Sequence, residues 1–228
     1  MDESPLDSPV WAALTSTHAG FAQGDGDARR YPPEVTPMVG LRRADAGAYA
    51  DLAALVDPGA MAPLFLATEE APPFPVVYAR DIAQMIHRAG LAPPKPELVG
   101  LMAPLGPEDV ADMLALVELT KPGPFGPRTI ELGDYLGIRN GGRLVAMAGV
   151  RLRPAGFSEI SGVCVHPDWQ GRGYGRAITE SVGAIVASRS EVAFLHVKTD
   201  NAAARRAYLG LGFEDRRTVH LRVVKLPG

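Results

Sequence analysis

The 228-residue chain is poor in cysteine and has no strong excess of charge of either sign. Cys164 is its one cysteine, so no disulfide can form within the chain, and a reducing compartment is expected. The net charge of −3 gives no reason to expect a nucleic-acid partner, and none is predicted. No group of His and Cys has metal-ligand spacing, and no metal is expected.

Long apolar runs are also missing from the sequence. No segment approaches the roughly 20 apolar residues that a membrane-spanning helix needs. The start, "MDESPLDSPVW", is acidic and interrupted by prolines, and it lacks the basic and apolar regions of a secretory signal. We therefore predict a soluble, cytoplasmic protein without a membrane partner.

A phrase in the first half recurs about sixty residues later. "VGLR" at 39–42 is followed by "ADLAALV" at 50–56, and "VGLM" at 99–102 is followed by "ADMLALV" at 111–117. Each copy is typical of a strand and an amphipathic helix, so the pattern predicts that a β-α unit occurs twice. Chance similarity in a chain rich in Ala and Leu is the alternative.

The segment between the two copies predicts the division of the chain. "PFPVVYA" is typical of a strand, and "RDIAQMIHRAG" of a helix ending at Gly90. "LAPPKPE" at 91–97 has the composition of a linker. We therefore expect an N-terminal part at 1–97 and a second domain at 98–228.

The second domain shows a clear order of elements. A strand at "LVGLMA" and a helix at "GPEDVADMLALVELT" precede two strands joined by the turn residues Asn140-Gly141-Gly142. A strand at "SEISGVCVHP" and a helix over 174–188 follow, and the final elements are "VAFLHV", a helix over 201–211 and "TVHLRVVKL". This order predicts an α/β fold, a mixed sheet with helices on its faces.

Three glycines stand between a predicted strand and a predicted helix, in "VCVHPDWQGRGYGRA" at 163–177. Backbone N–H groups at a helix start have no partner within the helix, and they attract phosphate. The spacing is not that of a dinucleotide-binding loop, because Arg176 stands where the third glycine should be. It is not a nucleotide P-loop either, because no lysine follows.

The pattern Gln170-x-x-Gly173-x-Gly175 resembles the pyrophosphate loop of the GNAT superfamily of N-acetyltransferases, Q/R-x-x-G-x-G/A. "SEISGVCVHP" resembles the fourth strand of that family, and "NAAARRAYLGLGF" at 201–213 is similar to its later N-x-x-A-x-x-x-Y-x-x-x-G-F pattern. The resemblance covers about residues 98–226. It implies a GNAT fold, with a mixed, mostly antiparallel sheet flanked by helices. The N-terminal part resembles the degenerate GNAT-like half of proteins related to glycine N-acyltransferase.

The resemblance implies that acetyl-CoA, as acyl-donor substrate, lies where the family's fourth and fifth strands separate. The pantetheine arm would pair with backbone of the fourth strand, and the pyrophosphate would bind amides of the glycine loop. Arg172 and Arg176 either assist or remain solvated. The residues expected to bind acetyl-CoA are Val163, Cys164, Val165, Gln170, Gly171, Arg172, Gly173, Tyr174, Gly175, Arg176 and Asn201.

The reaction that the family implies needs a base, because an amine with a pKa near 10.4 is protonated at neutral pH. Glu159 matches the placement of the catalytic glutamate in the histone-acetylating branch of the family. Alternation along a strand places it on the face of Ser161 and Val163, and burial is expected to raise its pKa. A surface role for Glu159, His196 as base, and a water chain are the alternatives.

The family pattern also implies a general acid. Its tyrosine, here Tyr208, points its hydroxyl at the thioester sulfur, and Asn201 lies about two helical turns earlier on the same side. Tyr208 could instead only anchor the helix on the sheet. Asn201 could act as a helix N-cap, a role compatible with ligand binding.

Together these features predict an acetyl-CoA-dependent N-acetyltransferase that acts on a small-molecule or peptide amine by direct attack on the thioester. Phe125, Glu131, Asp134 and Tyr135, in the loop "KPGPFGPRTIELGD" and just after it, are expected to shape the amine pocket, and the acids favour a cationic acceptor. A non-catalytic acyl-CoA-binding module and a transferase of longer acyl groups remain alternatives. A homodimer is left open.

Overall fold

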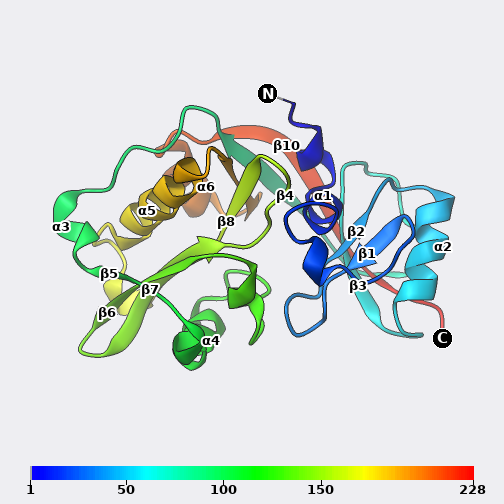
Figure 1. The fold of residues 1–228 in the computed structure, drawn as a ribbon, viewed down its shortest axis with the longest axis horizontal. Helices are drawn as coiled ribbons and strands as arrows, with labels where there is room; N and C mark the ends of the chain where they lie inside the picture. Colours follow the sequence, from blue (N-terminus) through cyan, green and yellow to red (C-terminus); the bar gives the residue numbers. More distant parts are fainter. Residues whose placement is uncertain (1) are drawn as a thin grey trace.

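The computed structural model describes residues 2–228 and contains one ten-stranded sheet (Figure 1). Its strands lie in the order β1-β2-β3-β10-β4-β9-β8-β7-β6-β5. The strands are β1 (Ala28–Arg30), β2 (Val39–Leu41), β3 (Met61–Leu66), β4 (Val76–His87), β5 (Met102–Pro104), β6 (Tyr135–Asn140), β7 (Arg143–Val150), β8 (Phe157–Val165), β9 (Val192–Lys198) and β10 (Glu214–Lys225). Neighbouring strands are antiparallel except β2 with β3 and β8 with β9, so the predicted mixed, mostly antiparallel sheet is confirmed.

Helices cover parts of this sheet, and the predicted helix over 174–188 is confirmed to the residue. The α-helices are α1 (Pro9–Leu14), α2 (Ala46–Leu55), α3 (Pro96–Val99), α4 (Val110–Thr120), α5 (Tyr174–Ser188) and α6 (Ala202–Leu209). Short 3-10 helices lie at Ser4–Asp7, Ala19–Phe21, Pro107–Asp109, Thr129–Leu132 and Pro167–Trp169. In the described part of the chain, no helix has the length and apolar character needed to cross a membrane.

The helix predicted at "RDIAQMIHRAG" is wrong, because these residues form most of β4. Residues 82–87 of this strand are buried, and they pair with β10 on one side and with β9 on the other. A strand buried on both faces has a nearly continuous apolar run, which periodicity cannot distinguish from a buried helix. Pairing with two distant strands decides the conformation.

The strand predicted at "LVGLMA" is also largely wrong. Pro96 occupies the first turn of the short helix α3, where its missing N–H costs no hydrogen bond. Strand β5 begins only at Met102. The second strand-helix unit therefore exists as β5 and α4, but it begins three residues later than the repeated phrase suggested.

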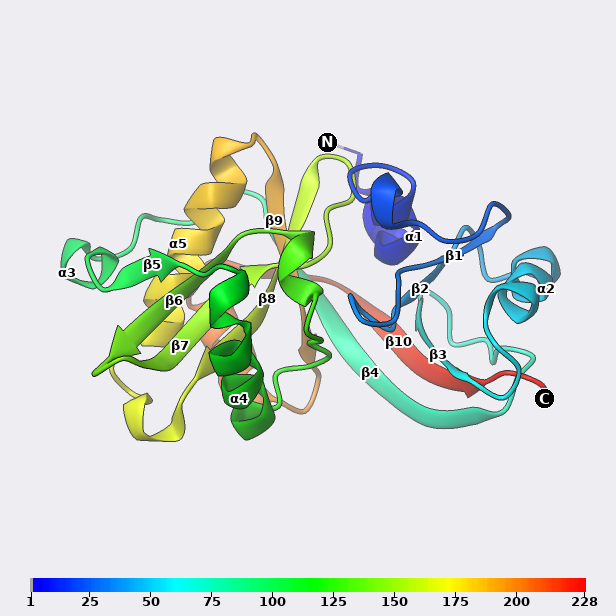
Figure 2. The ribbon, with the colours of Figure 1, turned by 60° about the horizontal axis from the view of Figure 1, so that its bottom comes forward.

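A different unit recurs in three dimensions. The segment β1-β2-α2-β3-β4 and the segment β7-β8-α5-β9-β10 each contain an antiparallel pair and then a parallel pair joined by a helix. The last strand of each unit pairs with the other unit: β10 of the second unit pairs with β3 of the first, and β4 of the first pairs with β9 of the second. Strands β4 and β10 also pair with each other, and they run as a curved ribbon between the two ends of the molecule (Figure 2).

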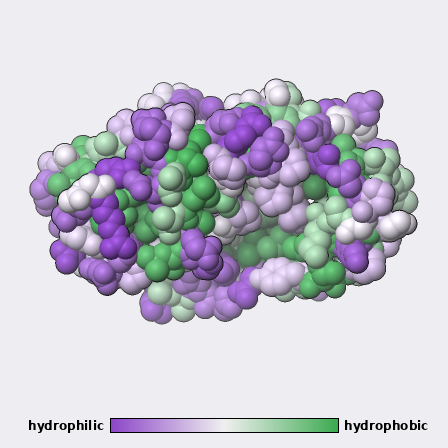
Figure 3. All heavy atoms as spheres, turned by 90° about the horizontal axis from the view of Figure 1, so that it is seen from below, coloured by the Kyte–Doolittle hydropathy of each residue, from purple (hydrophilic) through white to green (hydrophobic). Residues whose placement is uncertain are grey.

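The N-terminal segment packs against the middle of the molecule. Leu6, Val10 and Leu14 share an apolar cluster with Phe157 of β8 and Phe194 of β9. Seen from below, hydrophobic surface forms one patch left of centre and another toward the lower right, with more hydrophilic residues between them (Figure 3). The N-terminal segment therefore supports the place where β8 and β9 meet.

Candidate active site

Strands β8 and β9 separate after a short stretch of pairing. Phe157, Ser158 and Glu159 pair with Val192, Ala193 and Phe194, and the pairing ends there. A cleft of about 270 Å³ opens beyond this point, lined by residues 160–163 of β8 and 196–198 of β9. The separation between the family's fourth and fifth strands, expected from the sequence, is therefore present.

A β-bulge changes which way β8 presents its side chains. The register with β7 shifts between Met147 and Gly149, and Gly162 has a φ of +62°. An extra residue reverses the alternation, so Val163 packs against the cluster that contains Ile160. The prediction that Val163 shares a face with Glu159 is wrong for this reason.

The glycine loop leads directly into α5, and its backbone donors are free. Gly171 and Gly173 have φ values of +75° and +81°, a region that residues with a Cβ rarely adopt. Within residues 2–228, no amide from Gly171 to Arg176 donates to a protein acceptor, and the first helical bond there is Ala177 N–H to the Gly173 carbonyl. These donors lie at the positive end of a 15-residue helix, which suits an anionic phosphate.

The two arginines of the loop are engaged with protein groups. The Arg172 guanidinium lies 4.3 Å from the centre of the Trp169 ring. Arg176 pairs with Glu180 at 2.8 Å and donates to the Gly210 carbonyl at 3.3 Å. The free donors of the loop are therefore its backbone amides.

The other residues of the loop support its shape. Tyr174 stacks on Trp169 with ring centres 6.2 Å apart, and Gln170 Nε2 donates to the Val165 carbonyl at 3.5 Å. A Cβ added at Gly175 would lie 3.4 Å from the Val165 side chain. The loop is thus packed closely against the end of β8.

Asn201 and Tyr208 of the second motif line the same cleft. Asn201 Oδ1 accepts from the Ala204 amide at 3.1 Å, so the residue caps α6. Tyr208 packs edge-on against Phe213, with ring centres 5.8 Å apart. Its hydroxyl has no hydrogen-bond partner in the described part of the chain. Burial raises the pKa of Tyr208 to about 12, so the phenol is a neutral donor at pH 7.

Glu159 lies behind the cleft in a buried ion pair. Its carboxylate accepts from Arg151 Nε at 2.9 Å, from Arg151 Nη2 at 2.7 Å and from His196 Nδ1 at 2.8 Å. Burial alone would raise the pKa of Glu159, but Arg151 and His196 outweigh it and lower the pKa to about 2. The expectation that burial raises this pKa is therefore wrong, because the partner charges act against it.

Arg151 and His196, unlike Glu159, are lining residues of the cleft. Glu159 is an acceptor, so His196 Nδ1 donates to it. Nε2 lies 3.2 Å from Gln84 Nε2, which also donates to the Leu6 carbonyl. The carboxylate and Gln84 thus hold the orientation of the imidazole.

The loop after α4 contributes to the cleft, but through other residues than predicted. Residues 120–124 line it. Phe125 instead packs edge-on against the buried Tyr135, with ring centres 5.6 Å apart. Glu131 pairs with Arg128 and Asp134 with Arg189. The predicted amine pocket of Phe125, Glu131, Asp134 and Tyr135 is wrong, because pairing and core packing hold these side chains away from the cleft.

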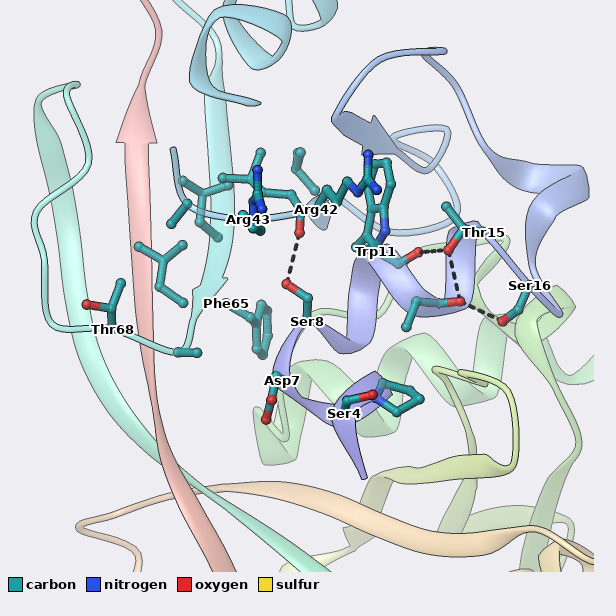
Figure 4. A pocket seen from close by; sticks show the side chains of 18 of the residues that line it. Ser4, Asp7, Ser8, Trp11, Thr15, Ser16, Arg42, Arg43, Phe65 and Thr68 are labelled. Atoms are coloured by element: carbon teal, nitrogen blue, oxygen red, sulfur yellow. Dashed lines mark hydrogen bonds between the residues drawn. The ribbon is translucent and has the colours of Figure 1, made fainter. Parts of the chain in front are cut away.

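A larger hollow of about 550 Å³ lies between α1, β2 and β3 (Figure 4). Strands β2 and β3 pair only at Val39 with Leu64, so they separate much as β8 and β9 do. Here, however, the Asp45 side chain accepts from the Ala48 amide at 3.0 Å and caps α2. The loop before α2 has no glycine, and a carboxylate stands at the helix start. The candidate site is therefore the smaller cleft.

Sequence reasoning missed several lining residues. Phe65, Tyr78 and Arg80 come from β3 and β4, in the first 97 residues, where no motif pointed to them. Arg151 lies opposite Glu159 across the β7-β8 hairpin, where the Arg151 amide donates to the Glu159 carbonyl. Two opposite charges at facing positions of a hairpin indicate an ion pair, which could have pointed to Arg151. The hairpin register was needed to read that signal.

Comparison with known proteins gives matches at the level of sequence. The family model described as FR47-like protein matches residues 135–223. N-alpha-acetyltransferase RimI of Mycobacterium tuberculosis is 38% identical over 84 residues, 35% of this chain and 51% of that protein. Mycothiol acetyltransferase of Tsukamurella paurometabola is 32% identical over 150 residues, 54% of this chain and 51% of that protein. The matches span about half the length of these curated relatives.

Solved structures extend the similarity to nearly the whole chain. A protein from Novosphingobium aromaticivorans assigned to the GNAT family of acetyltransferases is 34% identical, with a TM-score of 0.89 over 99% of this chain and 100% of that one. A GCN5-related N-acetyltransferase from Kribbella flavida is 17% identical, with a TM-score of 0.58 over 96% of each chain. The second similarity shows the fold alone.

Proposed function

This chain belongs to the GNAT family of N-acetyltransferases, and we propose that it transfers an acetyl group from acetyl-CoA to a primary amine. The observation that carries the proposal is the run of unpartnered amides from Gly171 to Arg176, beside strands that separate. These donors support binding of the CoA pyrophosphate, and Tyr208 and His196 in the same cleft support catalysis.

In this proposal the amides of Gly171 to Arg176 bind the pyrophosphate. Val163, Cys164 and Val165 offer backbone groups on the open edge of β8 to the pantetheine arm, and Asn201 contacts the arm from α6. The Cys164 side chain is buried, and burial raises the pKa of its thiol to about 11. Cys164 therefore contributes through its backbone, without thiolate chemistry.

We assign the role of base to His196, with Glu159 as its positioning residue. A carboxylate whose pKa is about 2 and whose oxygens already accept three hydrogen bonds is a poor proton acceptor near pH 7. His196 lines the cleft, and its Nδ1 is held by Glu159, so Nε2 is the nitrogen that would accept the proton. Nε2 faces the buried Gln84 side chain at 3.2 Å, so this role requires Gln84 to move aside before an amine reaches Nε2.

Tyr208 is proposed as the general acid. The amine attacks the thioester carbonyl, the C–N bond forms, and the C–S bond breaks with the electron pair leaving on sulfur. The free hydroxyl of Tyr208 donates a proton to that sulfur, and the proton that the nitrogen loses as the amide forms restores the phenol through solvent. Its pKa of about 12 keeps the hydroxyl protonated at neutral pH, which this role requires.

Release of free thiol from acetyl-CoA, measured with a panel of primary amines, tests the proposal. Amine-dependent release supports it, and the same assay with butyryl- and benzoyl-CoA measures the preference for the acyl chain. Tight binding of CoA, measured by calorimetry, with no release for any amine would contradict catalysis and indicate a binding module.

A further inference from the structure

The residues that line the cleft carry charge of one sign. Four are cationic, namely Arg80, Lys121, Arg151 and Lys198, and none of the lining residues is acidic. The acids expected to face an acceptor, Glu131 and Asp134, pair with arginines elsewhere. The charge inside the cleft is therefore opposite to that expected from the loop sequence.

Two of these cations keep donors free for a ligand. Arg151 binds Glu159 through Nε and Nη2, while Nη1 has no protein partner in the described part of the chain. Lys198, exposed at the end of β9, has no ion-pair partner within residues 2–228. It alternates with His196 along β9, so both side chains lie on the same face of that strand.

The other two cations already have acidic partners outside the lining. Arg80 pairs with Asp200 at 2.9 Å, and Lys121 pairs with Glu118. Both pairs include exposed side chains, so solvent weakens them. The charges of Arg80 and Lys121 are therefore partly compensated, whereas Lys198 has no acidic partner among residues 2–228.

Resting on the proposed function, we propose that the acceptor is a primary amine that also carries a carboxylate, as an amino acid does. Arg151 Nη1 and Lys198 Nζ bind the carboxylate and hold the amine nitrogen toward His196. Charge-assisted hydrogen bonds of this kind are the strong ones. Cations around the site also favour the neutral, attacking form of the amine, since like charge disfavours its protonated form.

Matched acceptors test this assignment. Thiol release from acetyl-CoA is measured with glycine and glycinamide, with L-glutamate and L-glutamine, and with spermidine. We expect kcat/KM to be about ten- to a hundredfold higher for glycine than for glycinamide, the value of one charge-assisted hydrogen bond. Glutamate and glutamine, which both carry an α-carboxylate, should react alike, and spermidine should be the poorest acceptor.

Variants of Lys198 test whether this side chain causes the preference for acceptors with a carboxylate. Lys198→Met should raise KM for the carboxylate acceptor about tenfold and leave KM for acetyl-CoA unchanged. Lys198→Glu should reverse the preference toward spermidine. Lys225→Met, an exposed lysine at the end of β10 and outside the cleft lining, is the matched control and should behave as wild type.

The outcomes separate this inference from the function on which it rests. If glycinamide or spermidine is preferred and Lys198→Met changes nothing, the inference is overturned while the acetyltransferase proposal stands. If no amine releases thiol although the folded protein binds CoA, the proposed function fails and the inference fails with it.

Discussion

At the scale of single residues, the charge of Glu159 is set by its two neighbours. A carboxylate that is 1% exposed would be neutral in apolar surroundings, but the Arg151 fork and His196 keep it ionised. Removal of one partner from a buried pair leaves the other charge without compensation. Glu159 therefore couples the stability of the β7-β8 hairpin to the orientation of His196.

Glu159→Gln should destabilise the protein by about 3–5 kcal/mol at pH 7, because Arg151 is left as an unpaired buried charge. The folded pKa lies below the ordinary value of about 4.3, so the ion pair stabilises above that pH. This contribution is lost as the pH falls toward 2. Urea unfolding at pH 7 and pH 3 measures it, and the difference between variant and wild type should shrink at pH 3.

Glu131→Gln is the control for this stability prediction. Glu131 also pairs with an arginine, but both partners are exposed, and such pairs contribute little. A loss in Glu131→Gln as large as that in Glu159→Gln, or a Glu159→Gln loss that persists unchanged at pH 3, would contradict the role of the buried pair.

Tyr208→Phe should lower kcat about a hundredfold, the usual size of one proton-transfer contribution, without changing KM for acetyl-CoA. Stability should stay the same, since the hydroxyl has no hydrogen-bond partner among the described residues. Thiol-release kinetics measure the effect, and Tyr49→Phe, in α2 of the N-terminal part, is the control. Full activity in Tyr208→Phe would show that Tyr208 is not the general acid.

At the scale of elements, the starts of α2 and α5 differ in how their free amides are used. Asp45 caps α2 with its own carboxylate, whereas Gly173 begins α5 without any side-chain cap. The positive end of α5 is therefore left for an anion from outside the protein. The start of α2, which has a capping acid, therefore has a structural role, whereas the start of α5, which has a glycine, is a candidate binding site.

Gly173→Ala should weaken CoA binding about tenfold, because the added Cβ keeps the phosphate from one of its charge-assisted amide hydrogen bonds. The forced left-handed conformation should also cost about 1–2 kcal/mol of stability. Gly59→Ala is a matched control, because Gly59 has a φ of +74° and open space around it, far from α5 in sequence. Calorimetry should show weaker binding in Gly173→Ala alone, and equal affinities in the two variants would count against the loop.

At the scale of the whole molecule, the sheet joins the two parts of the chain through exchanged strands. Strand β4, from the first 97 residues, lies between β9 and β10. Its Ile82, Met85 and Ile86 are buried, and Ala83 and Met85 join the cluster beneath α5. The predicted boundary near residue 97 therefore divides the sequence but not the sheet. Strand β4 of the first segment pairs with β9, and β10 of the second segment pairs with β3.

Residues 98–228 expressed alone should therefore fail to give a cooperative unfolding transition, because β9 and β10 lose the strand between them. Co-expression with residues 1–97 should restore the transition, measured by circular dichroism in urea. Cooperative unfolding of 98–228 by itself would show that β4 is dispensable.

The sequence by itself determined the local features, because they depend on neighbours in the chain. The limits of α5, the β6-β7 hairpin and the positive-φ glycines before α5 follow from short-range sterics and turn chemistry. Gly171 to Arg176, Asn201 and Tyr208 stand out in the sequence because they lie in two short motifs that resemble those of the GNAT family.

Only the tertiary structure decided the conformation of β4, the ionisation of Glu159 and the charge of the cleft. Each depends on partners far apart in sequence: Gln84 lies beside His196, Arg80 beside Asp200, and β4 between two strands of the other part. A buried strand has no periodicity of its own, and a carboxylate's pKa follows from whichever charges the fold places next to it.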